Sequence, residues 1–446
     1  MEKSETTNSL PAWEGYEKSL FRFFFIYFVI QALPLDWKYY QLLFSINWLD
    51  VQYGELFNLS RYSPQFIEGQ TYLNWLLAAT IALTGTVIWS FLNTKTKEYN
   101  ALYYWLRVIV RYRLAIGVIG YGFLKFFPLQ APLPSISNLN TNYGDLTSWK
   151  LLSMSLGIVP GYESFLGLVE IVAGLLLLYR KTASISAFVI LLFLGNVFLM
   201  NLAYEGAEDV YSLYLVTFAL LLFAYDGKRL YFLSAEKTAL PDQFQPLFSG
   251  SLKYWRLTLK SIFIFFFIFL YGYKTDAGYH KDPYQFPNTT GIPGASGIYN
   301  VTEFRLNNKA LPYSATDTVR WKDVVFERWA TISIRSNRSV ILEHASMETI
   351  AREDNERNYE YAGSAGRHYY QYQIDNQQQV LTLQNRNKNY PAEKLKLHFN
   401  RPSNSRIILT GKDQNKNAIY VVLDKIDKKY LLEEAAKQGR RKGVTL

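Results

Sequence analysis

One segment restricts the possible folds more than any other, because it is long enough to cross a membrane yet contains two carboxylates. Residues 161–179 read GYESFLGLVEIVAGLLLLY. At helical spacing, Glu163, Gly167, Glu170 and Gly174 fall on one stripe, and aliphatic side chains cover the remaining surface. An ionisable side chain near the centre of a bilayer costs upward of about 2.5 kcal/mol, so the stripe is expected to face other helices. The glycines allow a neighbouring helix to come close enough to supply a cationic partner.

Apolar runs recur along the first 275 residues, and none of membrane length follows them. Seven runs approach the roughly 20 residues that cross a bilayer. They fall at about 20–35, 72–92, 106–127, 161–179, 183–203, 209–225 and 257–273. The first is the shortest, and the aromatic segment 37–54 after it is typical of a helix that lies at the headgroups. The sequence therefore predicts an α-helical polytopic membrane bundle of about seven spans.

Basic residues occupy alternate connections between these runs. They lie before the first run and after the second, fourth and sixth: Lys3, Lys18, Arg22, Lys95, Lys97, Arg180, Lys181, Lys228, Arg229, Lys237, Lys253, Arg256 and Lys260. Cytoplasmic loops carry an excess of lysine and arginine. We therefore expect a multi-pass protein of the cell membrane with a cytoplasmic N-terminus and an external C-terminal domain, which would be periplasmic in a Gram-negative bacterium.

The last third of the chain has a different pattern, with short runs of alternating polarity separated by turn residues. The runs fall at 297–304, 319–327, 329–335, 339–345, 368–375, 378–384, 394–399, 405–411 and 417–426. Because no helix separates them, they predict an all-β antiparallel meander, and closure into a barrel would remove its edges. The opening Gly297-Ile298-Tyr299 resembles the start of a lipocalin-type barrel. A charged helix is expected at 428–438.

These observations predict five consecutive parts of the chain. They are N-terminal membrane segments with about two spans and an interfacial helix (1–100), a four-helix membrane core (101–235), a cytoplasmic loop with the last span (236–275), a linker (276–296) and an external barrel with a C-terminal helix (297–446).

Polar residues within the apolar runs are predicted to gather in the outer half of the bundle. A rise of about 1.5 Å per residue, counted from the outer ends of the third and fourth runs, puts Arg113 and Glu170 near mid-membrane. The same count puts Lys125 at the depth of Glu163. The predicted ion pairs are therefore Arg113 with Glu170 and Lys125 with Glu163. The polar cluster is completed by residues of the fifth and sixth runs, Asn196, Asn201, Asp209 and Tyr211.

Two interpretations of these charges stay open. A buried arginine–glutamate pair often serves only packing and topology. In the second interpretation, the buried pair relays protons or holds the polar head of an amphiphile such as a quinone or a lipid. Convergence of the cluster on one cavity would favour a site, whereas separate pairs between helices would favour packing.

Composition excludes several classes of function. The chain has no cysteine, so disulfides, thiol relays and cysteine-ligated clusters are excluded. The net charge is +10, but no long basic tract occurs, and no nucleic-acid partner is predicted. The histidines lie in separate elements without ligand spacing, so no metal site is predicted; they are His280, His344, His368 and His398.

Two stretches carry a resemblance to a known family. RYRLAIGVIGYGFLKFF ends with Gly122 and Lys125, and VEIVAGLLLLYRKTASISA contains Glu170 and Gly174 before a basic turn. On these motifs the segment from about 111 to 232 resembles the DoxX/DoxD-like family of small four-helix membrane proteins. The resemblance implies a helical bundle, linked in parts of that family to quinone-coupled oxidation of sulfur compounds or to membrane redox complexes. This chain adds spans on both sides and a β domain.

The leading functional prediction is a quinone-binding or redox-complex-associated subunit, in which Arg113 and Glu170 hold a polar head or relay a proton. The alternative is a non-enzymatic carrier or assembly protein whose barrel binds an apolar ligand or a membrane or periplasmic protein. A barrel cavity of several hundred Å³ would favour a carrier, and a filled interior would leave a docking or structural module. A transporter ranks last, because the polar groups gather in one half of the bundle.

Overall fold

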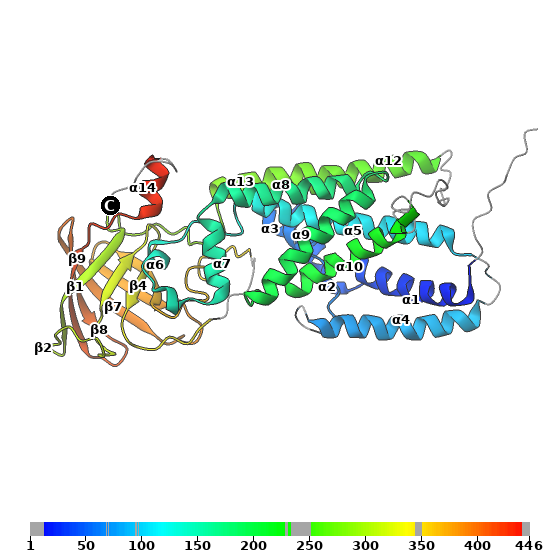
Figure 1. The fold of residues 1–446 in the computed structure, drawn as a ribbon. Coiled ribbons are helices and arrows are strands. Elements are labelled where there is room, and N and C mark those ends of the chain that lie inside the picture. Colours follow the sequence, from blue (N-terminus) through cyan, green and yellow to red (C-terminus); the bar gives the residue numbers. More distant parts are fainter. Residues whose placement is uncertain are drawn as a thin grey trace, which may run out of the picture. The chain divides into compact units, whose positions relative to one another are not determined.

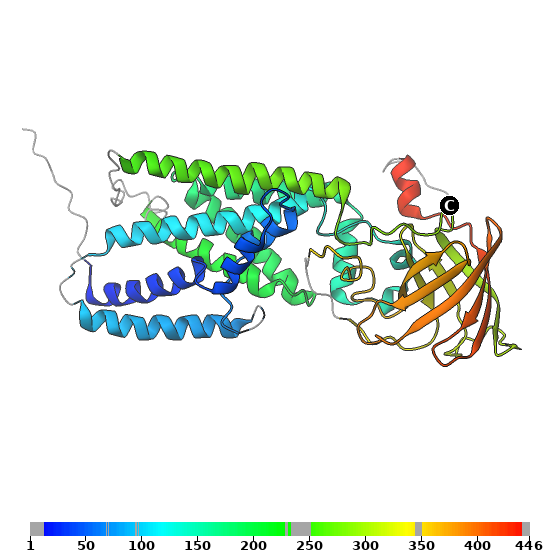
Figure 2. The same ribbon diagram turned by 180° about the vertical axis from the view of Figure 1, so that it is seen from behind.

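A computed structural model describes residues 13–67, 69, 71–93, 96, 98–227, 231–232, 251–343 and 350–438. The chain divides into two compact units (Figures 1 and 2). The first, called the helical unit, comprises Met1–Phe127, Ser164–Ala203 and Ala207–His280. The second, called the barrel unit, comprises Pro128–Glu163, Tyr204–Gly206 and Lys281–Leu446.

The helical unit is a bundle of long helices with two short ones inserted after the first. Its elements are α1 (Gly15–Ala32), α2 (Trp37–Ser45), α3 (Tyr53–Ser60), α4 (Tyr72–Leu92), α5 (Asn100–Phe126), α8 (Pro160–Leu177), α9 (Ala183–Ala203), α10 (Asp209–Tyr225), α12 (Ser251–Ile264), the π-helical η2 (Phe265–Leu270) and α13 (Tyr271–Lys281). In both ribbon views the long helices run side by side (Figures 1 and 2). Each of the seven predicted apolar runs overlaps a helix of this unit, and the last run continues from α12 through η2 into the start of α13.

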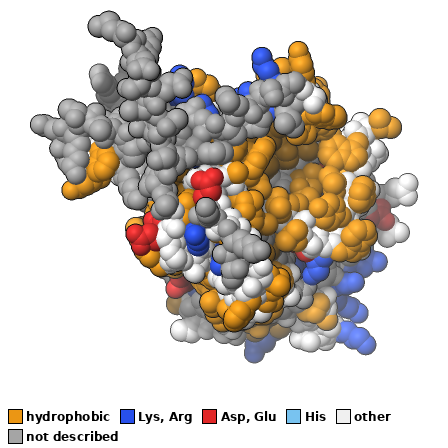
Figure 3. All heavy atoms as spheres, turned by 90° about the vertical axis from the view of Figure 1, so that its right-hand side faces the viewer, with side chains coloured by type: hydrophobic (Ala, Val, Ile, Leu, Met, Phe, Trp, Pro, Cys, Tyr) orange, Lys and Arg blue, Asp and Glu red, His pale blue; other side chains and the backbone are white. Residues whose placement is uncertain are grey.

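Five helical segments of the described chain are long and apolar enough to cross a membrane: Gly15–Ser45, Tyr72–Leu92, Pro160–Leu177, Ala183–Ala203 and Lys253–Lys281. The predicted number of seven is not confirmed. Helix α5 carries three arginines and Lys125, which lower its hydropathy, and α10 has only 17 residues. In the space-filling view, which looks onto the ends of the long helices, hydrophobic side chains cover much of the described surface (Figure 3).

The segment between the first two spans contains a buried helix that the sequence pattern did not predict. Helix α2 buries none of its residues, in keeping with a helix at the headgroups. Helix α3 begins with a capping box between Gln52 and Glu55. Its side chains Leu56 and Phe57 are 2% and 0% exposed, so α3 lies inside the unit.

The barrel unit is built on a closed antiparallel sheet. Its strands are β1 (Gly297–Leu306), β2 (Lys309–Ala310), β3 (Asp323–Phe326), β4 (Thr331–Arg335), β5 (His368–Asp375), β6 (Val380–Asn385), β7 (Lys394–Ser403), β8 (Arg406–Lys412) and β9 (Ala418–Lys425). Each strand pairs with its neighbour, and β1 also pairs with β9 from Tyr299↔Lys425 to Leu306↔Ile419. Eight strands thus close the barrel, and the two-residue β2 extends the edge of β1. Helix α14 (Leu431–Gln438) follows.

All eight barrel strands overlap predicted runs, but the run at 339–345 is not a strand within its described part, 339–343. The backbone of this segment bonds to side chains instead of to a neighbouring strand. Ile341 N donates to the Tyr390 hydroxyl, and the Asn387 side-chain amide donates to the Ile341 carbonyl. His344 and the end of that run lie outside the described residues, as do the basic residues Lys3, Lys95, Lys97, Lys228, Arg229 and Lys237. The predicted linker also starts later than 276, because α13 continues to Lys281.

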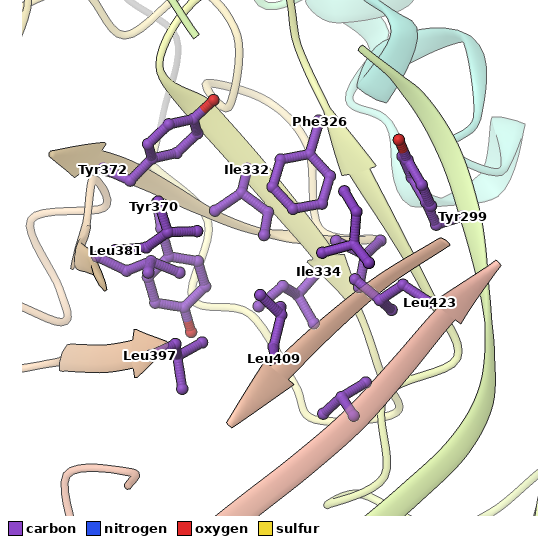
Figure 4. Packing of buried hydrophobic residues seen from close by; sticks show 14 of the residues in the cluster. Tyr299, Phe326, Ile332, Ile334, Tyr370, Tyr372, Leu381, Leu397, Leu409 and Leu423 are labelled. Carbon is purple, nitrogen blue, oxygen red and sulfur yellow. The ribbon is translucent and has the colours of Figure 1, made fainter. Parts of the chain in front are cut away.

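The interior of the barrel is filled by side chains (Figure 4). Alternation along β7 exposes Lys394 and Lys396 and buries Leu395 and Leu397. Strand β8 alternates in the same way, whereas β3 is buried on both faces. Phe326 and the leucines that face it in the core, Leu381, Leu397, Leu409 and Leu423, are each 0% exposed. A cavity wide enough for water would leave such side chains partly accessible. The centre of the described core is therefore closely packed.

The connection between α5 and α8, residues 128–163, folds as part of the barrel unit. We call it the insertion; it contains α6 (Ile136–Leu139), the 3₁₀ turn η1 (Tyr143–Asp145) and α7 (Ser148–Gly157). Ser137 donates from its backbone N–H and its hydroxyl to Glu327 Oε1 at 2.7 and 2.6 Å. Leu146 forms a β-bridge with Ser364. These contacts fix the insertion to the barrel, a feature that the sequence pattern did not predict.

Candidate functional site

The most deeply buried ion pair of the helical unit joins α5 to α8. Lys125 Nζ lies 2.5 Å from Glu170 Oε1, and the two side chains are 8% and 1% exposed. The helices meet through glycines, since a Cβ at Gly167 would lie 2.3 Å from Phe126 N and 2.5 Å from Gly122 O. The prediction that the glycine stripe brings a cation to the carboxylates is confirmed for Glu170.

Aromatic rings surround the ammonium of this pair. Lys125 Nζ lies 6.0 Å from the ring centroid of Tyr121 and 5.5 Å from that of Phe193. The Tyr121 ring in turn lies 5.6 Å from Tyr211, and Tyr211 stacks at 5.5 Å on Tyr214. A continuous series of rings therefore leads from the ion pair toward α10.

Arg113 lies at the other end of these rings, and its predicted pairing with Glu170 is wrong. Its guanidinium donates to the carbonyl of Ser60 at 2.7 Å, to the carbonyl of Tyr62, and to the hydroxyls of Tyr214 and Tyr211 at 3.3 and 3.4 Å. Ser60 is the last residue of α3 and Tyr62 follows shortly after it, so the guanidinium lies at the C-terminal end of this helix, where the helix dipole favours a cation. Because α3 was not predicted, its oxygen atoms were not considered as partners of Arg113.

Glu163 has backbone partners, so its predicted pairing with Lys125 is also wrong. Its Oε1 accepts hydrogen bonds from the N–H groups of Gln130 and Ala131 at 3.0 and 3.1 Å. These residues follow the end of α5, where the chain turns and exposes N–H groups that a carboxylate can bind. Glu163 is 0% exposed and stabilises this turn.

The remaining candidates divide between one that joins the cluster and three that do not. Tyr211 lies between Tyr121 and Arg113, as described. Asn196 is exposed on α9. Asn201 donates to the Val197 carbonyl of its own helix at 2.9 Å, and Asp209 accepts from the exposed Tyr72 hydroxyl at 2.7 Å.

Four contributors to the cluster were missed by the sequence prediction: Tyr121, Phe193, Ser60 and Tyr62. Tyr121 precedes Lys125 by four residues, and this helical spacing could have identified it. The carbonyls of Ser60 and Tyr62 carry no signal in the sequence, since every residue has a carbonyl.

The barrel unit contains a second group of buried charges beside the insertion. Glu360 is 0% exposed and accepts from Arg386 at 3.2 Å and from the Trp329 indole at 2.9 Å. Burial raises the pKa of Glu360 to about 7. Lys150 of the insertion is also 0% exposed; it donates to the Tyr359 carbonyl, and burial lowers its pKa to about 7. Lys150 thus ties α7 to the segment around Tyr359, whereas the Glu360 carboxylate binds side chains outside the insertion.

The histidines of the described barrel do not gather around a common point. His368 lies against Arg338, which donates to its ring at 3.2 Å, and burial together with this cation lowers its pKa to about 4. Within the described ranges, no group of three or more acidic or histidine side chains is arranged to hold a metal ion.

Comparisons of the chain with protein-family models, with curated proteins and with solved structures each found no match. The resemblance to DoxX/DoxD-like proteins therefore stays a prediction from the motifs.

Proposed function

We propose that the helical unit binds the polar head of a quinone-type amphiphile at the Lys125–Glu170 pair, as a membrane subunit associated with redox chemistry. The observation that carries this proposal is the 2.5 Å contact between two almost fully buried charges, with aromatic rings facing the ammonium. Buried charge pairs hold polar heads and relay protons in membrane proteins. The resemblance to DoxX/DoxD-like proteins includes both residues and supports the same role.

The Lys125 ammonium has hydrogen-bonding capacity for such a ligand. An ammonium carries three N–H groups, and Glu170 Oε1 is the hydrogen-bond acceptor that it contacts among the described residues. A quinone carbonyl would accept from a second N–H group, and its flat ring would pack against Tyr121 or Phe193. Lys125 thus takes the role that the sequence prediction assigned to Arg113, and Arg113 anchors α3.

The quinone content of the purified protein tests this proposal. We expect wild-type protein extracted into lipid nanodiscs to retain quinone, and Glu170→Gln to retain at least fivefold less, because the neutral amide no longer fixes the ammonium. Mass spectrometry of the extracted lipids gives the quinone-to-protein ratio. Asp209→Asn removes a carboxylate outside the cluster and should keep the wild-type ratio. A wild-type protein that carries no quinone would contradict the proposal.

We propose further that the barrel is lipocalin-like and external. Eight antiparallel strands in sequence order are the arrangement of lipocalin barrels. The insertion folds with the barrel in one unit. This supports a topology in which the end of α5, the start of α8 and the end of α13 lie on one side of the membrane. The basic pair Arg180 and Lys181 lies in the next connection, on the opposite side, which the charge rule assigns to the cytoplasm.

Labelling of introduced cysteines in intact cells tests the proposed sidedness, since the chain has no cysteine of its own. Tyr313→Cys, at a position 68% exposed on the barrel, should react with a membrane-impermeant maleimide. Lys181→Cys, exposed after α8, should react only after the cells are opened. The reverse pattern would contradict an external barrel.

We do not develop the carrier alternative, because the described side chains at the centre of the barrel pack against one another. The other part of that alternative is a docking role, in which the outer surface of the barrel would contact a partner protein. A groove of about 600 Å³ lies beside β1 and β2; polar and apolar side chains line it, among them Thr302, Tyr313, Arg320, Phe304 and Leu311.

A further inference from the structure

Helix α9 has one face packed in the unit and one face exposed. Its buried residues include Ser186, Ala187, Ile190 and Leu194. The exposed residues recur at helical spacing on another stripe: Ile185 (63%), Phe188 (46%), Leu192 (64%) and Leu199 (62%). Asn196 is exposed on the same stripe, between Leu192 and Leu199. A carboxamide therefore interrupts an otherwise apolar face.

The depth of Asn196 makes this position costly in lipid. It is the fourteenth residue of the 21-residue span Ala183–Ala203, about 20 Å along the helix axis and inside the apolar layer. Its side chain has no hydrogen-bond partner among the described residues, whereas Asn201 on the same helix bonds to its own backbone. An unsatisfied polar group in hydrocarbon costs several kcal/mol, so this position favours a partner from a neighbouring molecule.

We propose that this partner is Asn196 of a second copy of the chain, in a twofold dimer formed through α9. A carboxamide both donates and accepts, so two copies satisfy each other across a twofold axis without any other residue type. Gly195 adjoins the stripe, and a Cβ there would meet nothing within 4 Å, which leaves space for a second helix to approach. The exposed stripe has no charged residue that would select a charged partner.

Cysteine cross-linking in native membranes tests the geometry of this dimer. In a parallel twofold pair, each residue near the axis faces its own copy, so Leu192→Cys and Leu199→Cys should form disulfide-linked dimers on oxidation. Leu83→Cys on α4 is the control, because Leu83 is equally exposed, at 59%, but lies on another helix. Cross-linking at 192 and 199 no stronger than at 83, or cross-linking to a different protein, would overturn the proposal.

The contribution of the carboxamide is measured by subunit exchange in lipid vesicles at increasing lipid-to-protein ratios. Asn196→Leu is expected to weaken dimerisation about 5- to 30-fold, the range that corresponds to one interhelical polar contact in model peptides. Asn201→Leu, which removes an amide bonded within its own helix, should leave the dissociation constant of the dimer unchanged. Since Asn196 is exposed, its replacement should not unfold the monomer. If the dissociation constant of the dimer is the same in Asn196→Leu as in the wild type, the proposal is overturned.

Discussion

Replacing Lys125 with methionine is expected to lower the free energy of unfolding of the helical unit by about 3–5 kcal/mol. The substitution keeps the volume of the side chain but leaves the Glu170 carboxylate, 1% exposed, without its cation. A buried charge that loses its partner is far more costly than the pair was favourable. Equilibrium unfolding of the full-length protein in mixed micelles gives the change, and Lys181→Met, at an exposed position, serves as the matched control.

The double variant Lys125→Met/Glu170→Leu should recover most of this loss, because an apolar pair of similar size needs no countercharge. We expect its free energy of unfolding to lie within about 1 kcal/mol of the wild-type value. A single variant as stable as the wild type would show that the carboxylate is not enclosed in the bundle as described.

In the barrel unit, Glu360→Gln is expected to change how stability depends on pH. Burial raises the folded-state pKa of Glu360 to about 7, above its ordinary value of 4.5, so the native state retains this proton longer than the unfolded state. The stability that the proton contributes is fully present below pH 4.5 and is lost as pH rises through 7. The loss is up to about 1.4 kcal/mol per pH unit, or roughly 3 kcal/mol over the interval.

Hydrogen–deuterium exchange of the β-strand peptides, measured on the full-length protein at several pH values, follows this effect locally. The wild-type profile minus the Glu360→Gln profile isolates Glu360 from other groups, including Arg386 and Glu327, which face it, and His368. Glu327 should still contribute in the variant, because burial raises its pKa in the same direction. Identical pH profiles in both proteins would contradict the assignment.

The elements of both units could be predicted because their signals are local. Apolar runs of membrane length gave the positions of the long helices, and alternation between turn residues gave all eight barrel strands. The contacts between distant segments could not be predicted in this way. Glu327 binds Ser137 across 190 residues, and no local pattern connects the two. The run at 339–345 alternates as a strand does, but its backbone bonds to side chains such as that of Asn387 and not to a neighbouring strand.

The residues of the candidate site were predicted better than their pairing. Depth along the membrane fixes one coordinate of a side chain, and the direction around the helix fixes another. Arg113 and Lys125 are twelve residues apart, so they point about 120° away from each other around α5. Glu163 and Glu170 are seven residues apart and share a face. Adding direction to depth would have allowed only one of the two cations to reach that face.

The most direct test of the central claim is photolabelling with an azido-quinone in native membranes, followed by mapping of the labelled peptides. If the Lys125–Glu170 pair holds the quinone head, label should concentrate on α5 and α8 near these residues. It should disappear in Lys125→Met/Glu170→Leu, which keeps the fold but lacks the charges. Label spread evenly over the lipid-facing helices α4 and α12, or unchanged in the double variant, would contradict the account.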